Sequence, residues 1–240
     1  MPERPAARGS SVVTGASRGI GAAVAVELEA RGFEVWSLSR SGDAPAGRAL
    51  TCDVTDEAAL REAFSRIAKG GPIGSLVSNA GVHASVQSRK LETAEYERIM
   101  SLNATAVMTG AREIYPHLVR AGGGTIINMG SFFDRMAVPY NLAYCASKAA
   151  VGAMTRCLAA EWAEQSIRVI NVAPGYVETA LNREFLARED MRRYLESRVP
   201  LKRAGRPEEV ARLVAALLTE DIPYLTGETI YVDASHAISH

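Results

Sequence analysis

The sequence predicts a single α/β domain in which a mostly parallel, seven-stranded sheet is doubly wound, with helices on both faces. Three observations lead to this prediction. Short apolar runs alternate with helical stretches along the whole chain, as in successive βα units. The 240 residues suit one large domain (1–240), and a content of 48% hydrophobic residues is enough to bury a full core. No linker or low-complexity tract divides the chain.

The first strand leads directly into a glycine-rich turn and a helix. The apolar run 11–13 is followed by TGASRGIG at 14–21 and by an Ala- and Val-rich helical pattern that ends near Arg31. Glycines in such a turn let the backbone approach a pyrophosphate, and a helix N-terminus offers unpaired N–H groups. A plain tight turn is the alternative. The residues expected to bind a dinucleotide here are Gly15, Ser17, Arg18, Gly19, Ile20 and Gly21.

The second strand, 34–38, ends at Ser39 and Arg40. A dinucleotide fold that prefers NAD usually has an acidic residue here to hold the ribose 2′-hydroxyl, and this chain has none. Ser39 can instead bond a phosphate oxygen, and Arg40 supplies charge together with Arg18. The sequence therefore favours NADP(H) over NAD(H), the alternative being that both arginines are solvated surface charges.

The third strand, 49–52, follows after only a short segment rich in Gly and Pro, so we expect one crossover helix to be replaced by a loop. Asp53 and Val54 after this strand are expected to face the adenine. Thr55-Asp56 then cap a helix at 57–68.

The strand 75–78 ends in Asn79-Ala80-Gly81, a second turn of small residues that is expected to contact the cofactor. A long helix is predicted from 93 to 119, and it contains Asn103. Because Asn is a mediocre residue for a helix interior, its side chain either bonds something specific or is merely tolerated.

One stretch of the chain brings together three groups suited to proton transfer. Ser131 follows the apolar run 125–129, at the carboxyl end of a strand, where open α/β sheets bind ligands. Tyr144 and Lys148 are spaced i and i+4 in a predicted helix at 142–163, so they leave the same face. A nearby cation should lower the pKa of the phenol towards neutral pH, while Ser131 donates to a substrate carbonyl oxygen.

Tyr-x-x-x-Lys pairs occur by chance in many helices, but two features favour a functional pair here. Of the eight Tyr residues, only Tyr144 has Lys four positions on, and Lys148 is one of only four lysines among 27 basic residues. An ammonium and a guanidinium are not interchangeable beside a phenol, so the use of Lys at this position is informative.

The remaining chain completes the sheet. The strand 167–172 runs into Pro174-Gly175, an Arg-rich helical insert at 181–199 is expected to act as a mobile lid over the substrate, and a helix at 207–218 precedes a last strand at 229–232. The histidines have no spacing that suggests a metal site, and no metal is predicted; we interpret them as surface or tail residues. They are His83, His117, His236 and His240.

Composition limits the function classes. The formal net charge is zero and the pI about 6.9, so binding to nucleic acid or to an anionic membrane surface is not expected. The three cysteines lack metal-ligand or redox-pair spacing, which indicates free thiols in a reducing compartment. Residues 1–9 are polar and expected to be flexible, and no run has the length of a spanning helix. We therefore predict a cytoplasmic protein.

In combination and order, these motifs resemble those of the short-chain dehydrogenase/reductase family, over residues 11–233. The resemblance implies a Rossmann fold, a homo-oligomer (a tetramer or a dimer), and hydride transfer between nicotinamide C4 and a carbonyl or alcohol of a small molecule. The motifs that carry it are TGASRGIG at 14–21, NAG at 79–81, Asn103, Ser131, Tyr144-x-x-x-Lys148, and Pro174-Gly175 followed by Thr179.

The resemblance also implies roles for these residues. Tyr144 would be the acid–base, Ser131 the ligand of the carbonyl, and Lys148 both ribose anchor and activator of the phenol. Asn103 would hold a water in a proton relay. Pro174, Gly175, Val177 and Thr179 would contact the nicotinamide, the last two by orienting its carboxamide. The side chains expected to line a partly apolar substrate pocket are Phe132, Phe133, Val138, Tyr140, Tyr176, Leu181 and Phe185.

Within the family, the chain looks closest to the 3-oxoacyl-carrier-protein reductases, but it departs from them. Gly122 and Gln165 stand where those reductases use basic residues to dock the carrier, and Ala234-Ser235 replaces a usual glycine pair. Three functions therefore stay open: an NADPH-dependent ketoreductase for a free carbonyl compound, a carrier- or CoA-linked 3-oxoacyl reductase that uses the Arg-rich insert, and a cofactor-binding regulator without activity.

Overall fold

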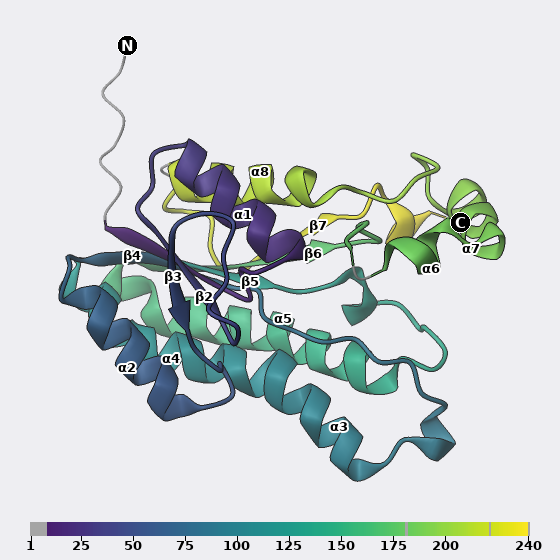
Figure 1. Ribbon diagram of the computed structural model, residues 1–240, viewed down its shortest axis with the longest axis horizontal. Helices are drawn as coiled ribbons and strands as arrows, with labels where there is room; N and C mark the ends of the chain where they lie inside the picture. Colours follow the sequence, from purple (N-terminus) through teal and green to yellow (C-terminus); the bar gives the residue numbers. More distant parts are fainter. Residues whose placement is uncertain (1–8, 181, 221, 240) are drawn as a thin grey trace.

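The computed structural model describes residues 9–180, 182–220 and 222–239, and in them the seven predicted strands form one parallel sheet (Figure 1). The spatial order is β3-β2-β1-β4-β5-β6-β7. The order reverses between β1 and β4, and ligands of such sheets bind in the crevice at this switch point. The strands are β1 (Ser10–Thr14), β2 (Val35–Ser39), β3 (Arg48–Thr51), β4 (Ile73–Ser78), β5 (Gly124–Met129), β6 (Ile167–Pro174) and β7 (Thr229–Val232).

Helices cover both faces of the sheet, which explains why the central strands read as continuous apolar runs. One face packs against α1 and α8, around Leu28 and Val214, and the other against α2, α4 and α5, around Phe64 and Ile114 (Figure 1). Every residue of β1 and β5 is buried, whereas the edge strands β3 and β7 are partly exposed. The helices are α1 (Gly19–Ala30), α2 (Glu57–Ala68), α4 (Ala106–Arg120), α5 (Leu142–Trp162) and α8 (Pro207–Thr219).

The connection from β2 to β3 contains no helix, as predicted from its Gly and Pro content. It is a loop whose end next to β3 is held by two hydrogen bonds. The Ser37 hydroxyl donates to the carbonyl oxygen of Ala46 (2.8 Å), and the Gly47 N–H donates to the Glu29 carboxylate on α1 (3.0 Å). Gly47 has φ +74°, and a Cβ there would overlap the backbone of Val35.

The long helix predicted at 93–119 is interrupted, so that prediction is wrong in one respect. α3 (Thr93–Met100) passes into a π-helical turn, η2 (Ser101–Thr105), before α4 begins. The turn contains Asn103, whose side chain bonds to the backbone of a neighbouring loop and not to solvent. π-turns inside helices are frequent at functional sites.

The Arg-rich insert is helical, as predicted, and forms α6 (Arg183–Ala187) and α7 (Glu189–Arg198). Leu186, Met191, Leu195 and Val199 make a small core of their own, separate from the two clusters that flank the sheet. Figure 1 shows these helices at the end of the molecule where the described C-terminus also lies. Leu181 lies outside the described residues, as does all but Gly9 of the segment expected to be flexible.

Four short 3₁₀ turns complete the described chain: η1 (Ser88–Lys90), η3 (Phe132–Asp134), η4 (Ala163–Gln165) and η5 (His236–Ile238). Within the described residues, no helix is both long enough and apolar enough to cross a membrane.

Candidate active site

The glycine turn after β1 is shaped so that side chains do not fit. Gly15 and Gly19 have φ +65° and +61°, a region that favours glycine. A Cβ at Gly21 would overlap the carbonyl oxygen of Gly15 and the amide nitrogen of Asn79. The turn therefore keeps an open backbone surface, and Ser17 and Ile20 beside it are partly buried.

The first turn of α1 has no side-chain cap. Arg18 stands at the N-cap position in an extended conformation and makes no capping hydrogen bond. The free N–H groups and the dipole of a helix N-terminus attract anions. An uncapped helix end beside a turn that excludes side chains fits the pyrophosphate of a dinucleotide.

The turn after β4 is tied to the glycine turn. The Asn79 amide donates to the carbonyl oxygens of Thr14 (3.0 Å) and Gly15 (3.1 Å). The Thr14 hydroxyl oxygen in turn accepts from the N–H groups of Asn79 (3.0 Å) and Ala80 (3.2 Å). These four bonds lock together the two strand ends that flank the switch point, so Asn79 has a structural role that the sequence did not predict.

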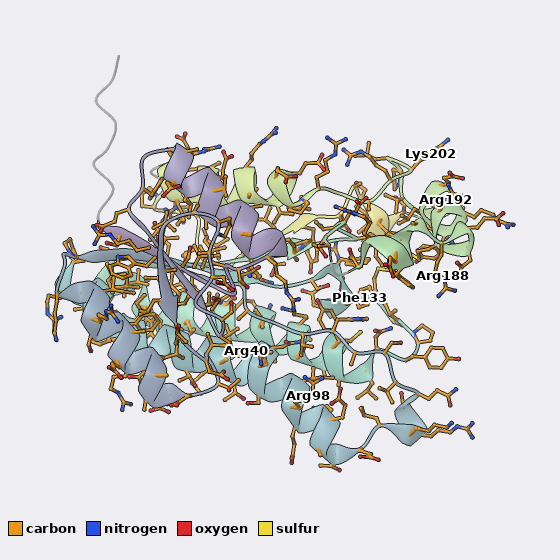
Figure 2. The ribbon with its side chains drawn as sticks, in the orientation of Figure 1. Arg40, Arg98, Phe133, Arg188, Arg192 and Lys202 are labelled. Atoms are coloured by element: carbon orange, nitrogen blue, oxygen red, sulfur yellow. The ribbon has the colours of Figure 1, made fainter. Side chains whose placement is uncertain are left out.

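Arg18, in the glycine turn, and Arg40, directly after β2, are the two cations expected near the adenosine ribose. Both are exposed, and neither makes an ion pair with any residue that the structure describes. Arg40 projects near the middle of the molecule in the view of Figure 2. Ser39 is buried, and its hydroxyl donates to the carbonyl oxygen of Asp43 (3.0 Å), within its own turn.

Asp53 and Val54 follow β3 at the same edge. The Asp53 carboxylate accepts from the N–H (2.9 Å) and the hydroxyl (2.7 Å) of Thr55. These hydrogen bonds lower the pKa of Asp53, and the charge of Arg40 adds to the effect. Val54 and Ala80 line a hollow between β4 and α4, on the side where the adenine is expected.

The end of β5 and the first turns of α5 bring Ser131, Tyr144 and Lys148 together, as the sequence predicts. The Ser131 oxygen accepts from the N–H of Phe133 (3.3 Å), so its own hydrogen stays available, and a side-chain hydrogen bond joins it to Tyr144. Lys148 is only 6% exposed, and its Nζ donates to the carbonyl oxygen of Met129 (2.7 Å). The same Nζ lies 5.8 Å from the centre of the Tyr144 ring.

The pKa values differ from the sequence-based expectation. Burial raises the pKa of Tyr144, and the hydrogen bond from Ser131 opposes this only in part. Lys148 was expected to lower the phenol pKa, but in the protein alone the shift is upward. The reason is that burial desolvates the phenol itself. The ammonium is desolvated as well, which lowers the pKa of Lys148 to about 8.

Asn103 is fully buried, and its side chain is fully used. Its Oδ1 accepts from the N–H of Val82 (2.8 Å), and its Nδ2 donates to the carbonyl oxygen of Val82 (2.8 Å) and to the Ser147 hydroxyl (3.1 Å). A Cβ on Gly81 would lie 3.2 Å from the Asn103 Oδ1 and 3.8 Å from the Lys148 Nζ. Asn103 therefore fixes the loop that follows β4 and passes close to Lys148.

An aromatic cluster extends from Tyr144 towards α7. The Phe133 ring packs edge-on against Tyr144 at 5.7 Å between centroids, and Phe132 contacts Phe133 at 4.6 Å and Tyr176 at 5.2 Å. In Figure 2 Phe133 lies between the sheet and the end that carries α6 and α7.

His236 was interpreted as a surface or tail residue, and that interpretation is wrong. It is 5% exposed and stacks on Phe132 at 5.3 Å, and its Nε2 is 3.2 Å from the Tyr194 hydroxyl on α7. The turn at Ala234 and Ser235, with φ +54° and +62°, directs the chain back onto the cluster. Sequence periodicity gives no signal for such a contact, because it depends on how the tail folds back.

No sequence pattern indicates that His83 lies beside Tyr144, and the contact makes it a functional candidate in addition to His236. It is exposed, but its ring stands edge-on to Tyr144, with 4.9 Å between centroids. Its Nε2 is 2.6 Å from the Asn141 Oδ1.

The other expected pocket residues are spread around the site mouth. Val138 is partly buried, whereas Tyr140 and Phe185 are 55% and 47% exposed. Thr179 lies opposite the glycine turn, since a Cβ on Gly19 would be 3.4 Å from its methyl group.

The Thr179 N–H and hydroxyl both bond the Asn182 Oδ1, at 2.7 and 3.1 Å. Val177 is buried beyond Pro174 and Gly175, where Gly175 packs so closely that a Cβ would be 2.8 Å from the Asp233 backbone. Among the described residues, no group of three or more His, Cys, Asp or Glu could hold a metal ion.

Comparison with known proteins decides the family. A family profile described as enoyl-(acyl carrier protein) reductase matches residues 15–234. The chain is 34% identical to the 3-oxoacyl-(acyl-carrier-protein) reductase MabA of Mycobacterium tuberculosis, over 96% of this chain and 94% of the relative. The chain belongs to the short-chain dehydrogenase/reductase family.

Other members of the short-chain dehydrogenase/reductase family differ widely in what they act on. The chain is 33% identical to 3beta-hydroxysteroid dehydrogenase 1 of Eggerthella lenta, over 92% of this chain and 91% of the relative. The solved structure of a gluconate 5-dehydrogenase from Burkholderia cenocepacia, in complex with NADP and tartrate, superposes with a TM-score of 0.90 at 28% identity, over 97% of this chain and 96% of that one. The chain is therefore an oxidoreductase of a family that uses nicotinamide cofactors on alcohol or carbonyl groups.

Gly21→Ala should weaken nicotinamide dinucleotide binding by at least about tenfold, because the new methyl group displaces the Gly15 carbonyl and the Asn79 amide that shape the turn. The measurement is a fluorescence titration with NADPH and NADH. Gly70→Ala is the matched control, since its Cβ would meet only the Ile67 carbonyl oxygen, at 3.4 Å, away from the turn. Equal affinities for Gly21→Ala and the unmodified protein would contradict the assignment of the turn.

Proposed function

We propose that the protein is an NADP(H)-dependent oxidoreductase that transfers hydride between the nicotinamide and a carbonyl or secondary alcohol of a partly apolar small molecule, with Tyr144 as acid–base. One observation carries this proposal. Tyr144 is hydrogen-bonded to Ser131 at the carboxyl edge of β5, and the buried ammonium of Lys148 lies 5.8 Å from the centre of its ring. A proton donor and an oxygen ligand thus meet at one point.

In the reduction direction, Ser131 and Tyr144 hold the oxygen of the substrate. The Ser131 oxygen already accepts from the Phe133 N–H, and its single hydrogen, which bonds the phenol in the protein alone, would turn to the substrate oxygen when a substrate binds. The bound nicotinamide supplies the hydride to the carbonyl carbon. As negative charge develops on the substrate oxygen, Tyr144 delivers its proton there, and its raised pKa keeps that proton in place at neutral pH until it is needed.

Lys148 stabilises the phenolate that this step leaves. Below a pH of about 8 it carries an ammonium, and its bond to the Met129 carbonyl leaves two of its three hydrogens free for Tyr144 and a ribose hydroxyl. Asn103 supports this path because its side chain holds the backbone of Val82, and the π-turn around it is where the water of the proton relay is expected.

The preference for NADP(H) rests on Arg18 and Arg40. Both are exposed cations without an ion pair in the described chain, at the edge where the adenosine ribose is expected, and β2 ends without a carboxylate. A 2′-phosphate would give these charges a partner. Ser39 contributes by holding the turn that presents Arg40, since its hydroxyl is bonded to Asp43.

Arg40→Asp should shift the ratio of kcat/KM for NADPH to that for NADH towards NADH by at least about tenfold, because it replaces a charge-assisted bond with repulsion. Steady-state rates with the two cofactors measure the ratio. Arg89→Asp, which removes an exposed arginine far along the chain, is the control. If the unmodified protein uses NADH as well as NADPH, the proposed phosphate site is wrong.

Tyr144→Phe should lower kcat by about 10²-fold or more while leaving NADPH binding nearly unchanged, because the phenol is the proposed proton donor and its ring still packs. Stopped-flow and fluorescence titration separate the two quantities. Near-normal turnover would mean that the proton comes from another group.

Substitutions of Lys148 test its two proposed roles, as the cation beside the phenol and as the ligand of the ribose. Lys148→Ala should weaken both turnover and cofactor binding, and Lys148→Arg should restore little, because a planar guanidinium does not match the site. In the unmodified enzyme the reduction rate should fall as the pH rises through about 8, where Lys148 loses its ammonium.

A 3-oxoacyl reductase acting on a carrier- or CoA-linked thioester is the second candidate function. The observation in its favour is the lid, where Arg192, Arg198 and Lys202 make no ion pair with any described residue and where Arg188, Arg192 and Lys202 project from one end of the molecule (Figure 2). Relatives such as MabA carry this activity in their names. Gly122 and Gln165 stand where carrier-docking residues are basic in such reductases, so the free substrate is preferred.

A small 3-oxoacyl thioester analogue and its carrier-bound form should react with kcat/KM values that agree within about threefold, because the docking charges at 122 and 165 are absent. A large preference for the carrier-bound form that weakens with added salt would favour the second candidate instead. The homo-oligomeric state and the cytoplasmic location stay predictions.

A further inference from the structure

His83 is held against the ring of Tyr144 by a rigid loop. The residue before it, Val82, has both its N–H and its carbonyl oxygen bonded by the Asn103 side chain, each at 2.8 Å. Further along the loop, the Val86 N–H donates to the carbonyl oxygen of Tyr140 (2.7 Å). Clamped on both sides, His83 meets Tyr144 edge-on at 4.9 Å between ring centroids.

The hydrogen bond between His83 and Asn141 defines which ring nitrogen is free. The Asn141 Nδ2 donates to the carbonyl oxygen of Pro139 (2.8 Å), so the amide oxygen faces His83. The His83 Nε2, 2.6 Å away, must therefore be the donor. In the neutral ring the proton is then on Nε2, and Nδ1 is a hydrogen-bond acceptor that no described residue occupies.

Asn141 gives up another bond to hold His83. It stands at the N-cap position of α5, where Asn is among the preferred residues, yet its side chain makes no capping bond. It is only 7% exposed, so its position does not depend on solvent. At the start of α5, the Asn141 side chain thus orients His83 instead of capping the helix.

His83 and Phe133 form one continuous surface beside Tyr144. Phe133 packs against Tyr144 at 5.7 Å and offers only a phenyl ring, His83 at 4.9 Å offers an acceptor nitrogen, and the two rings meet each other edge-on at 6.3 Å. A substrate whose oxygen is bound by Ser131 and Tyr144 would place the groups on its neighbouring carbons against this surface. Its Phe133 part suits an apolar group, and its His83 part suits a hydroxyl.

We propose that His83 is a specificity-determining residue whose Nδ1 accepts a hydrogen bond from a hydroxyl on the carbon next to the reacting one. The substrate class is then α-hydroxy ketones and the corresponding vicinal diols. This inference rests on the proposed function, because it takes Tyr144 and Ser131 as the ligands of the reacting oxygen.

The test uses 2-hydroxycyclohexanone and cyclohexanone, which differ by a single hydroxyl, with NADPH oxidation followed by absorbance. The unmodified enzyme should favour the hydroxy ketone by about three- to tenfold in kcat/KM, the scale of one neutral hydrogen bond. Two variants separate the ring nitrogens. His83→Gln places its amide nitrogen near the former Nε2 and lacks an acceptor at Nδ1, whereas His83→Asn places its amide oxygen near the former Nδ1.

The expected result is that His83→Gln and His83→Phe abolish the preference and that His83→Asn keeps part of it. Equal losses on both ketones in all three variants would show that His83 only supports the fold of the loop. Turnover of both ketones without a preference in the unmodified enzyme would overturn the inference on His83 but not the proposed function. Turnover of neither ketone, nor of cyclohexanol and 1,2-cyclohexanediol in the reverse direction, would contradict both.

A second measurement does not depend on turnover. In long-range ¹H–¹⁵N spectra of the NADP⁺ complex, the Nδ1 resonance of His83 should move on addition of 1,2-cyclohexanediol and should stay in place with cyclohexanol. Identical responses to the two alcohols would contradict the inference even if both bind.

Discussion

The hydrogen bond from the Lys148 ammonium to the Met129 carbonyl ties α5 to the end of β5, and the site depends on this link because Tyr144 lies on α5 and Ser131 follows β5. The Asn128 amide, which donates to the Thr155 hydroxyl (3.0 Å), and the packing of Phe133 on Tyr144 support the same arrangement. The bond of Lys148 is made at a cost. A pKa lowered from 10.5 to about 8 corresponds to roughly 3 kcal/mol of unfavourable desolvation at neutral pH. The packing of the hydrophobic core on both faces of the sheet must offset this desolvation cost.

Local strain surrounds the same region. Tyr140, Ala234 and Ser235 are non-glycine residues with φ between +54° and +68°, a conformation that costs of order 1 kcal/mol each. Tyr140 lies just before α5 and bonds the His83 loop through its carbonyl, and the other two direct His236 onto Phe132. Non-glycine residues rarely adopt this backbone conformation, and such exceptions concentrate where function overrides stability.

The order of elements, the parallel sheet and the loop that replaces a crossover helix could all be predicted, because apolar runs and the Gly and Pro content of 41–48 are local properties. The meeting of Ser131, Tyr144 and Lys148 also followed from spacing and strand ends. The π-turn at Asn103 could not be predicted, since it depends on bonds to Val82, a residue on another segment.

The same limit explains the other differences. The burial of His236, the contact of His83 with Tyr144 and the upward shift of the Tyr144 pKa all arise from packing between distant segments. Helical spacing shows that Tyr144 and Lys148 share a face, but it carries no information about how much water that face retains.

The loop between β2 and β3 has a consequence for how this enzyme can change. It carries Arg40, and only Ala46 within it is buried. β3 beyond it is largely exposed as well, so substitutions at 40–45 disturb no part of the hydrophobic core. The fold thus places the loop that carries Arg40 at one edge of the sheet, apart from the end of β5 and the start of α5, so the loop can change in sequence without rebuilding that region.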